Sequence, residues 1–531
     1  MERIQSCYPF LDCGIYPNAY CIKHIKIKVN HWMEHLQSNI IEGKLLNPGM
    51  GTYNNKKITV FGANRSGIAI AILLHGNGAK ISITDSRKKD ELSDELRQLN
   101  ELEIDFFLGG HSEDCIKDSD LIVVSPGVPL DIPILEKAKQ DGIKILGELE
   151  VAARHCPAPI IAITGTKGKS TTTLLTAAIL EKCNIFNSVV VAGNIGVPLS
   201  SKITELTPKD ICVVEVSSFQ LETTKLFCPL VSVVLNLSRD HLDRHGTMEA
   251  YFTAKSKICK NQTESEWIVL NITDEYERRF AENTYAQKTY FSDDINSHTS
   301  SNNWIKDKAS RIGAELRIKN EKIGLYSLNH GRANYVCDTE ELPLAGAHNI
   351  RNVLAAIVVG TILGIQPSIM RKALLDFTRT HPALEHAFEK VATINGVDYI
   401  NDSKATNVIA TNAALESIDR ISMDQQYSKR VILIMGGYDK GNDYSSLVEP
   451  IQRHVKSLIL LGEHTHNIQT TFNDCCNIDH VSKMDQAVEL AEDISDHGDI
   501  VLLSPANASF DMYSDYKARG EAFKKAVLDL S

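Results

Sequence analysis

The stretch that decides the fold reads PIIAITGTKGKSTTTLLTAAIL and runs from residue 159 to residue 180. Its first six residues are mostly aliphatic or β-branched, which is typical of a buried strand, and its second half predicts a helix. A glycine-rich loop, GTKGKST at residues 165–171, connects the two. Such a loop is typical of a phosphate site, because backbone N–H groups at a helix N-terminus attract anions.

The side chains of this loop suit a nucleotide. Lys169 would reach the β- and γ-phosphates, and the Ser170 hydroxyl would be a magnesium ligand. The common phosphate-loop pattern has a glycine where this chain has Ile163, so the loop is a short variant. A glycine-rich turn without a ligand is the alternative, and the strand–loop–helix setting disfavours it.

Short apolar runs alternate with helical stretches on both sides of this loop. Examples are KITVFGANRSG (57–67), KISITD (80–85), DLIVVSPG (120–127), DICVVEVSS (210–218), KRVILIMGG (429–437) and DIVLLSP (499–505). Strand and helix in alternation predict α/β domains with parallel sheets.

The length of 531 residues suggests about three domains, at roughly 100–200 residues each. We expect a first domain at 56–147, a central domain at 148–378 and a last domain at 379–531. An N-terminal extension, residues 1–55, matches no pattern, and its Gly/Pro/Asn-rich end reads as a linker. The polar piece at 292–342 predicts loops with a hairpin or two.

Composition narrows the class of protein. The chain is 43% hydrophobic and 23% charged, which is ordinary for a globular protein, and its net charge of −11 argues against a nucleic-acid partner. It has no apolar run of about 18 residues and no convincing export signal, so we expect a cytoplasmic protein without a membrane span. Its 12 cysteines are scattered, and a metal cluster of Cys7, Cys13 and Cys21 is disfavoured by their spacing.

A second glycine loop, GANRSG at 62–67, is less specific. It has Asn64 where the dinucleotide fingerprint has its middle glycine, although Asp85 follows about 20 residues later in the position of a ribose-binding acid. On these residues alone, a redox cofactor site, a UDP-sugar site and a purely structural turn remain open.

Acids and histidines follow two further apolar runs. Glu215 ends a strand-like run, and Asp240, His241 and Asp243 lie in NLSRDHLDRH after another. Residues of this kind at strand ends near a phosphate loop can meet Mg²⁺ and the γ-phosphate. They therefore predict a second cation position.

The order of motifs resembles the Mur ligase family, over about residues 57–531. The phosphate loop is followed by GNIGVP (193–198), EVSSFQLE (215–222), LSRDHLDRHG (237–246), AYFTAKSKI (250–258), GAHNIRNVLAA (346–356), NDSKATN (401–407), GGYDKGND (436–443) and LLSPANASFDMY (502–513). The last three motifs are similar to those of the family member that adds D-glutamate.

This resemblance implies an ATP-dependent ligase with three domains: Rossmann-like first and last domains and a central P-loop ATPase-type domain. It implies the substrates UDP-N-acetylmuramoyl-L-alanine and D-glutamate, joined through an acyl phosphate during cytoplasmic peptidoglycan precursor synthesis. It also implies Mg²⁺, a monomer, no nucleic-acid or membrane partner, and domain closure during catalysis. The second glycine loop then reads as a UDP-sugar site.

The resemblance also implies a role for individual residues. The ATP contacts would be Gly165, Thr166, Lys167, Gly168, Lys169, Ser170, Thr171, Asn349, Asn352, His386 and Asp402. The UDP-precursor contacts would be Arg65, Ser66, Asp85, Ser86, Arg87, Ser125, Pro126, Gly127 and Asn194. The D-glutamate contacts would be Thr406, Lys440, Ser509, Phe510 and Tyr516. The metal ligands would be Ser170, Glu215, His241 and a carbamylated Lys255, and the catalytic residues Lys169, His241, Lys255 and Lys404.

Three features depart from the family pattern. Ala387 replaces an arginine that would contact the nucleotide, Asn507 stands where a small residue is expected, and residues 1–55 have no counterpart. Because the arginine expected at position 387 is missing, a rival hypothesis stays open, in which the chain is a catalytically weakened protein that only binds the UDP precursor. A Mur ligase that adds another amino acid is the second rival.

Overall fold

The computed structural model describes residues 53–92, 96–99, 102–295, 312–319, 321–329, 332–344, 346–377, 386, 388–418, 429–438, 441–462 and 465–530. These residues form two compact units. The first ends at Glu315 and adds Tyr326–Val336 and Ala355–Met370, and the second contains Leu316–Leu325, Cys337–Leu354 and the chain from Arg371 onward. Within the described part of the chain, every helix is too short or too polar to cross a membrane.

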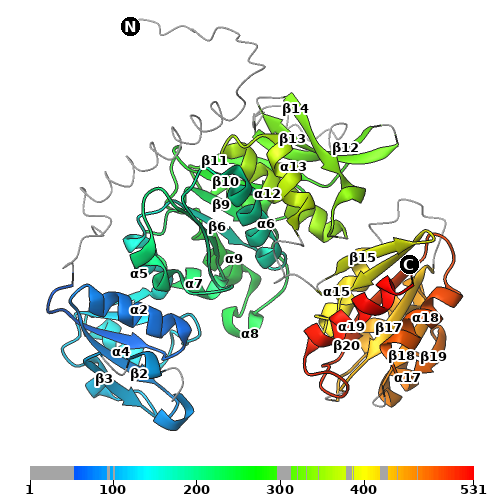
Figure 1. The fold of residues 1–531 in the computed structure, drawn as a ribbon. Helices are drawn as coiled ribbons and strands as arrows, with labels where there is room; N and C mark the ends of the chain where they lie inside the picture. The colour runs from blue at the N-terminus through cyan, green and yellow to red at the C-terminus, as the bar shows by residue number, and fades with distance from the viewer. Residues whose placement is uncertain are drawn as a thin grey trace, which may run out of the picture. The chain divides into compact units, whose positions relative to one another are not determined.

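The first sheet of the first unit has five parallel strands in the order β3-β2-β1-β4-β5 (Figure 1). The strands are β1 (Lys57–Phe61), β2 (Lys80–Asp85), β3 (Ile104–Leu108), β4 (Leu121–Val124) and β5 (Lys144–Gly147). Helix α2 (Arg65–Gly76) packs on one face and α4 (Pro133–Gln140) on the other. The loops after β1, β2 and β4 meet at the carboxyl edge of the sheet, where doubly wound folds bind ligands.

The second sheet has nine strands in the order β14-β13-β12-β11-β10-β9-β6-β8-β7, and its strands from β7 to β12 are parallel. They are β6 (Ile160–Thr164), β7 (Val189–Gly193), β8 (Ile211–Glu215), β9 (Val231–Val234), β10 (Trp267–Asn271), β11 (Gln287–Ser292), β12 (Ile312–Lys319), β13 (Lys322–Asn329) and β14 (Arg332–Asp338). β6 lies between β8 and β9, so the phosphate loop after β6 has a strand end on either side.

Two glycines give the phosphate loop its shape. Gly168, the residue before α6 (Lys169–Cys183), has φ 84°, and Gly165 has φ 155°. A Cβ on Gly165 would lie 3.0 Å from the Cβ of Leu235. Because side chains disfavour positive φ, only glycine lets the chain turn this tightly from β6 into α6.

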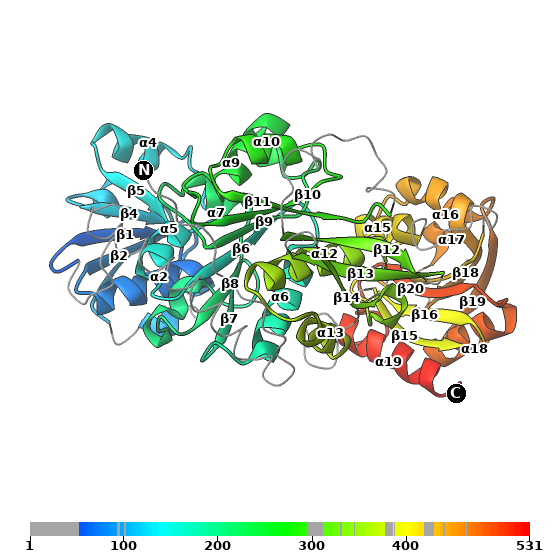
Figure 2. The same cartoon turned by 90° about the horizontal axis from the view of Figure 1, so that it is seen from above.

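The third sheet, in the second unit, has the order β15-β16-β20-β17-β18-β19 and is parallel except for β15 (Figure 2). Its strands are β15 (Glu389–Ile394), β16 (Val397–Asn401), β17 (Val431–Gly436), β18 (Val455–Leu461), β19 (Asn477–Val481) and β20 (Ile500–Ala506). Alternate residues of β17 enter two different cores: Leu433 packs with one helix layer and Ile434 with the other.

The helices cover these sheets. The third sheet carries α15 (Val408–Ile418), α16 (Val448–His454) and α17 (His466–Phe472) on one face and α18 (Met484–Ile494) and α19 (Tyr516–Leu528) on the other. The remaining helices are α5 (Glu148–His155), α7 (Ser218–Glu222), α8 (Leu242–His245), α9 (Met248–Ser256), α10 (Glu277–Glu282), α12 (Ala347–Ile362) and α13 (Pro367–Leu375).

The prediction of three α/β domains with mostly parallel sheets is confirmed by these three sheets. The boundaries near 148 and 378 stay predictions. The piece at 292–342, predicted as loops with a hairpin or two, contains β12, β13 and β14, which follow one another in the chain and are neighbours in the sheet, as hairpins require. The N-terminal extension up to residue 52, with Cys7, Cys13 and Cys21, lies outside the described residues.

Helix α5 follows the first sheet directly but is held by the central domain. The Glu150 carboxylate, fully buried, accepts hydrogen bonds from the backbone N–H groups of Lys225, Leu226 and Phe227. The Arg154 guanidinium, itself nearly buried, also donates to Glu150. One carboxylate therefore balances a buried cation and pairs three backbone donors, of which that of Phe227 is buried.

Replacing Glu150 with alanine is expected to lower the free energy of unfolding by about 3–5 kcal/mol, because Arg154 would remain buried without its counter-ion. Glu150→Gln should cost less, since an amide oxygen still accepts hydrogen bonds. Urea titration of both variants checks this. Glu205→Ala is the matched control: Glu205 pairs with Lys202 on the surface, where its side chain is 65% exposed, and its loss should change stability by about 0.5 kcal/mol or less. Equal changes in the free energy of unfolding for Glu150→Ala and Glu205→Ala would contradict the role of Glu150 as the buried counter-ion of Arg154.

Candidate active site

Lys169, the first residue of α6, folds back over the phosphate loop. Its Nζ donates to the carbonyl oxygens of Gly165 (3.1 Å) and Thr166 (2.8 Å). Burial lowers the pKa of Lys169, while the nearby carboxylates of Glu215 and Asp240 act in the opposite direction. The cation is thus held at the centre of the loop, where the sequence predicts phosphates.

Residues distant in sequence brace the phosphate loop. The Asn236 side-chain oxygen accepts the backbone N–H groups of Thr166 (3.1 Å) and Lys167 (2.9 Å). The Thr166 hydroxyl lies 3.3 Å from the Tyr251 hydroxyl and donates to the carbonyl of Ser238. The motif pattern assigned no role to Asn236 or Tyr251, although both lie within motifs or beside them.

Glu215, at the end of β8, joins two groups of predicted ligands. One carboxylate oxygen accepts the Ser170 hydroxyl at 2.7 Å, and the other accepts the Asn194 side-chain amide at 2.8 Å. Glu215 is 2% exposed. Parallel pairing of β8 with β6 and β7 brings the ends of all three strands to one edge, which explains why these residues meet.

Lys255, in α9, is buried beside the same loop. Its Nζ lies 2.9 Å from the Gly165 carbonyl oxygen, 3.3 Å from the Thr164 hydroxyl and 4.9 Å from the centre of the Tyr251 ring. Burial, reinforced by the Lys169 cation, lowers the pKa of Lys255 to about 7. At neutral pH a large fraction of this amine is therefore uncharged and nucleophilic.

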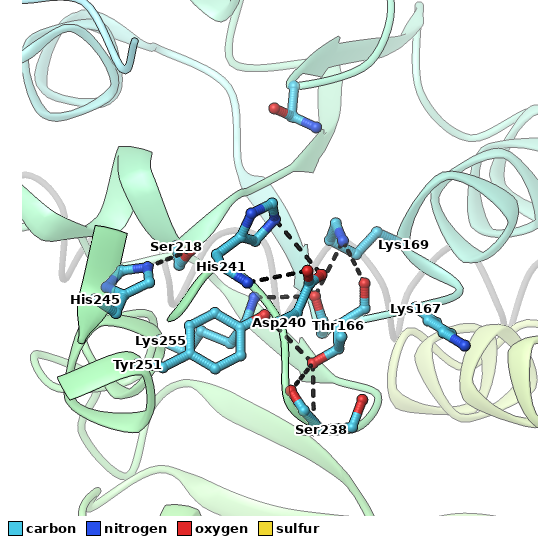
Figure 3. Close-up of polar contacts among 12 residues, drawn as sticks. Thr166, Lys167, Lys169, Ser218, Ser238, Asp240, His241, His245, Tyr251 and Lys255 are labelled. Carbon is cyan, nitrogen blue, oxygen red and sulfur yellow. Dashed lines mark hydrogen bonds and ion pairs between the residues drawn. The ribbon is translucent and has the colours of Figure 1, made fainter. Parts of the chain in front are cut away.

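His241 lies opposite Lys255 (Figure 3). It has φ 53°, an uncommon backbone conformation for a residue other than glycine, and it is the residue just before α8. Its Nε2 lies 3.5 Å from a carboxylate oxygen of Asp240, and its ring stands edge-on to Phe219 at 4.9 Å. Lys169, Asp240, His241 and Lys255 thus gather around one small region next to the phosphate loop.

The donor set suits a hard cation only in part. Among the described residues, no three His, Cys, Asp or Glu side chains form a ready metal cluster. Ser170 and Glu215 nevertheless present oxygen atoms at the phosphate loop, and Mg²⁺ commonly takes one or two protein oxygens and completes its shell with water and phosphate. The residues present therefore fit a phosphate-bound Mg²⁺ better than an all-protein metal cage.

A cleft of about 600 Å³ opens between the first sheet and the central domain. All nine residues expected to bind the UDP precursor line it: Arg65, Ser66, Asp85, Ser86, Arg87, Ser125, Pro126, Gly127 and Asn194. The cleft also includes His111 and Gln220, which the sequence pattern did not single out.

Asp85 shapes the wall of this cleft. Its carboxylate accepts the backbone N–H of Ala63 in the glycine loop (2.7 Å) and hydrogen bonds from the backbone and guanidinium of Arg87. Burial raises the pKa of Asp85, but these hydrogen bonds outweigh burial and hold the pKa below its usual value. Asp85 is therefore an anion that fixes the loop and orients Arg87 into the cleft.

In the second unit, Asp402 follows β16 and is buried. It accepts hydrogen bonds from the Ser504 hydroxyl (2.9 Å) and the Phe388 backbone N–H (3.1 Å), and burial raises its pKa to about 7. His386 is buried, with φ 67°; its Nδ1 lies 2.9 Å from the Asn401 amide and its Nε2 3.5 Å from Glu521. The ring packs on α19.

The two asparagines of α12 form a pair, in which Asn352 donates to Asn349 at 3.2 Å, and both are 3% exposed. Lys404 is exposed, and its backbone N–H donates to the carbonyl of His386. Ala387 and Lys440 lie outside the described residues.

The described residues expected to bind D-glutamate come from the loop after β16, the loop after β20 and the start of α19. The backbone N–H of Tyr438 donates to the Ala508 carbonyl at 2.8 Å, so Tyr438 lies beside the residue that precedes Ser509. Ser509 is buried, whereas Phe510 is 68% exposed. Thr406 and Tyr516 are half-buried. The Tyr516 carbonyl accepts the Ser403 hydroxyl, so α19 begins against the loop of residues 402–406.

Asn507 is held through both its backbone carbonyl and its side chain. The Arg519 guanidinium is 2% exposed and donates to the Ser403 hydroxyl and carbonyl and to the Asn507 carbonyl. The Asn507 side-chain oxygen accepts Asn442 (2.7 Å) and the Tyr444 hydroxyl (2.8 Å). The side-chain oxygen of Asn507 therefore has two hydrogen-bond donors. Arg519 joins Ser403 to Asn507 inside the domain, and the sequence pattern did not single it out.

Three family models match the chain. They are the Mur ligase MurD-like N-terminal domain at residues 56–147, the Mur ligase middle domain at 163–360, and the Mur ligase glutamate ligase domain at 388–507. Together they span well over half of the chain, and the first two contain the cleft and the phosphate loop described above.

Relatives cover nearly the same residues. The UDP-N-acetylmuramoylalanine–D-glutamate ligase of Koribacter versatilis is 39% identical over 89% of this chain and 97% of its own length, and that of Clostridioides difficile is 37% identical over 90% and 99%. The crystal structure of MurF ligase from Thermotoga maritima in complex with ADP has a TM-score of 0.50 at 15% identity, covering 92% of this chain and 98% of that one, and shows the shared fold. The chain belongs to the Mur ligase family.

Proposed function

We propose that this chain uses ATP to join D-glutamate to the L-alanine carboxylate of UDP-N-acetylmuramoyl-L-alanine, a step of peptidoglycan precursor synthesis. Relatives at 37–39% identity that carry this activity in their names support the assignment, and the chain covers 96–99% of their length. The proposal includes a place for the reaction in the cytoplasm.

One structural observation carries the proposal. Asn194 lines the cleft proposed for the UDP precursor and donates to Glu215, and Glu215 accepts the Ser170 hydroxyl of the phosphate loop. A substrate held by its UDP group in the cleft would therefore extend toward the phosphate loop. This is the geometry required to bring a substrate carboxylate to the γ-phosphate of ATP.

The reaction would proceed in two steps. A carboxylate oxygen of the L-alanine residue attacks the γ-phosphorus of ATP, the bond to the β-phosphate oxygen breaks, and ADP leaves. The D-glutamate amine then attacks the carbonyl carbon of the acyl phosphate, loses a proton, and phosphate leaves as the amide forms. Lys169 and the backbone N–H groups of the phosphate loop would hold the phosphates and stabilise the charge that develops in the first step.

Lys255 fits a further role in this scheme. Its amine is buried, has a lowered pKa and lies beside the cationic Lys169. Addition of CO₂ would convert it into an anionic carbamate that supplies oxygen ligands, with His241 as its partner across the site. Bound Mg²⁺ would neutralise phosphate charge, with Ser170 and Glu215 as ligands at the first position.

In the second unit, Asn349, Asn352, His386 and Asp402 are proposed for the nucleotide and Lys404 for the reacting carboxylates. Thr406, Lys440, Ser509, Phe510 and Tyr516 are proposed for D-glutamate. A cationic Lys440 suits the side-chain carboxylate of this amino acid. The rival hypothesis of a binding protein without catalysis predicts decay of the phosphate site, whereas Lys169, Glu215, His241 and Lys255 are all retained and Glu215 still joins Ser170 to Asn194.

The amino-acid specificity provides the first test. Phosphate release from ATP is expected only when both UDP-N-acetylmuramoyl-L-alanine and D-glutamate are present, with at most trace release for L-glutamate, L-alanine or meso-diaminopimelate. A malachite-green assay with each amino acid measures this. Release with meso-diaminopimelate instead would favour another Mur ligase, and binding of the precursor without any release would favour the weakened relative.

The second test concerns Lys255. Lys255→Met should lower kcat by about 10²–10³-fold or more, because the loss of one preorganised charged group at a phosphoryl-transfer site has effects of this size. Incubation of the unmodified protein with ¹³CO₂ should give a carbamate carbon signal in NMR that Lys255→Met lacks.

Carbamate formation on Lys255 is expected to increase with pH. Only the neutral amine reacts with CO₂, so at a fixed concentration of dissolved CO₂ the extent of labelling should rise as the pH rises through about 7, the pKa of Lys255. Lys257→Met is the control: this nearby lysine of the same motif should leave the labelling signal intact. A signal that survives in Lys255→Met would contradict the assignment.

A further inference from the structure

Arg244 has no part in the chemistry proposed above, yet it touches both domains of the first unit. It lies in α8, three residues after His241, and its side chain is 21% exposed. One guanidinium nitrogen donates to the Pro126 carbonyl at 3.1 Å, and another donates to the Val128 carbonyl at 3.3 Å. Pro126 and Val128 belong to the loop after β4 that lines the UDP-precursor cleft.

On the other side, Arg244 is fixed by the central domain. Its guanidinium donates to the Glu222 carboxylate at 2.7 Å and lies 4.3 Å above the centre of the Phe219 ring. Both partners belong to α7, the helix that follows Glu215. Arg244 therefore fastens the cleft loop of the first domain to the helix next to the phosphate site.

The contacts continue from Arg244 to the phosphate loop. Glu222 also pairs with Nδ1 of His245 at 3.3 Å, and Nε2 of His245 lies 3.0 Å from the Ser218 hydroxyl (Figure 3). The Phe219 ring packs against both His241 and His245, and His245 packs against Tyr251, which contacts Thr166. The backbone of the cleft loop and the phosphate loop are thus joined by contacts that meet at Arg244.

We propose that Arg244 is a positioning residue that sets the UDP-precursor loop at a fixed distance from the phosphate site, so that a precursor anchored by its UDP group presents its carboxylate to the γ-phosphate. The inference rests on the proposed function. A lysine has one ammonium group and cannot donate along the separate directions that the planar guanidinium provides. The Arg244 guanidinium binds two backbone carbonyl oxygens of the first domain, and it binds a carboxylate and an aromatic ring of the central domain.

The cleft loop does not need Arg244 to keep its own shape. The Ser125 backbone N–H donates to Phe61, the Ser125 hydroxyl donates to Gly62, and the Val128 backbone N–H donates to Ser125. All of these contacts are internal to the first domain. Loss of Arg244 should therefore leave affinity for UDP intact while the orientation of the loop relative to the phosphate site relaxes.

The test compares Arg244→Gln and Arg244→Lys with the unmodified protein. For both variants kcat/KM for UDP-N-acetylmuramoyl-L-alanine should fall by about 10–100-fold, because displacement of a reacting group by about 1 Å can cost this much. The KM for ATP and the Kd for UDP, measured by calorimetry, should change by less than about twofold, since neither depends on the spacing of the two sites. Thermal unfolding identifies any variant that fails to fold.

Arg279→Gln is the matched control. Arg279 also donates to a carboxylate, that of Glu249, and also lies over an aromatic ring, that of Phe252 at 4.0 Å, but all its contacts lie within the central domain. It should leave kcat/KM for the precursor unchanged. Equal effects of Arg279→Gln and Arg244→Gln would overturn the inference, as would a loss of UDP affinity as large as the loss of kcat/KM.

Failure of the Arg244 inference can be distinguished from failure of the proposed function. If the unmodified protein shows no D-glutamate-dependent phosphate release, the proposed function fails, and the kinetic comparison has no reference. If the unmodified protein is active and Arg244→Lys retains full kcat/KM for the precursor, the function stands and the positioning role of Arg244 is wrong.

Discussion

The carboxylate of Glu215 is the constraint on which the first unit's site depends. Its two oxygens have different partners, the Ser170 hydroxyl and the Asn194 amide, and its burial removes competing water. A buried carboxylate without such partners is costly, so the ends of β6, β7 and β8 must stay in register for this anion to be satisfied. The sheet thus fixes the distance between the phosphate loop and the cleft that Asn194 lines.

Local motifs were sufficient to predict the strands and the glycine loops, whereas the cleft residues were predicted from the family resemblance. Lys169 and Ser170 follow a strand within one motif, and the nine cleft residues lie at or just beyond the carboxyl ends of parallel strands, where such folds place ligands. Periodicity and spacing contain this information because it arises from neighbours along the chain.

Residues that hold the site loops in place through contacts distant in sequence were not predictable from local motifs. Asn236 acts on Thr166 across 70 positions, and Arg519 acts on Ser403 across 116. The bracing by Asn236, Arg244 and Arg519 depends on tertiary packing that no local pattern contains. For Arg519 the available signal was an arginine just inside the helix that follows a substrate loop. For Asn507, the unexpected polar side chain is matched by Asn442 and Tyr444, which a single sequence does not reveal as neighbours.

Because Glu150 is hydrogen-bonded to the central domain, the point at which the chain is cut decides whether a central-domain fragment keeps these contacts. Helix α5 follows the first sheet in the chain, yet its carboxylate completes the hydrogen bonding of residues 225–227 and its first residue, Glu148, accepts the Ser200 hydroxyl. A fragment that starts at Glu148 keeps the backbone donors of residues 225–227 and the Ser200 hydroxyl paired. A fragment that starts after His155 exposes them, and an excised central domain should therefore carry α5 as its own N-terminal segment.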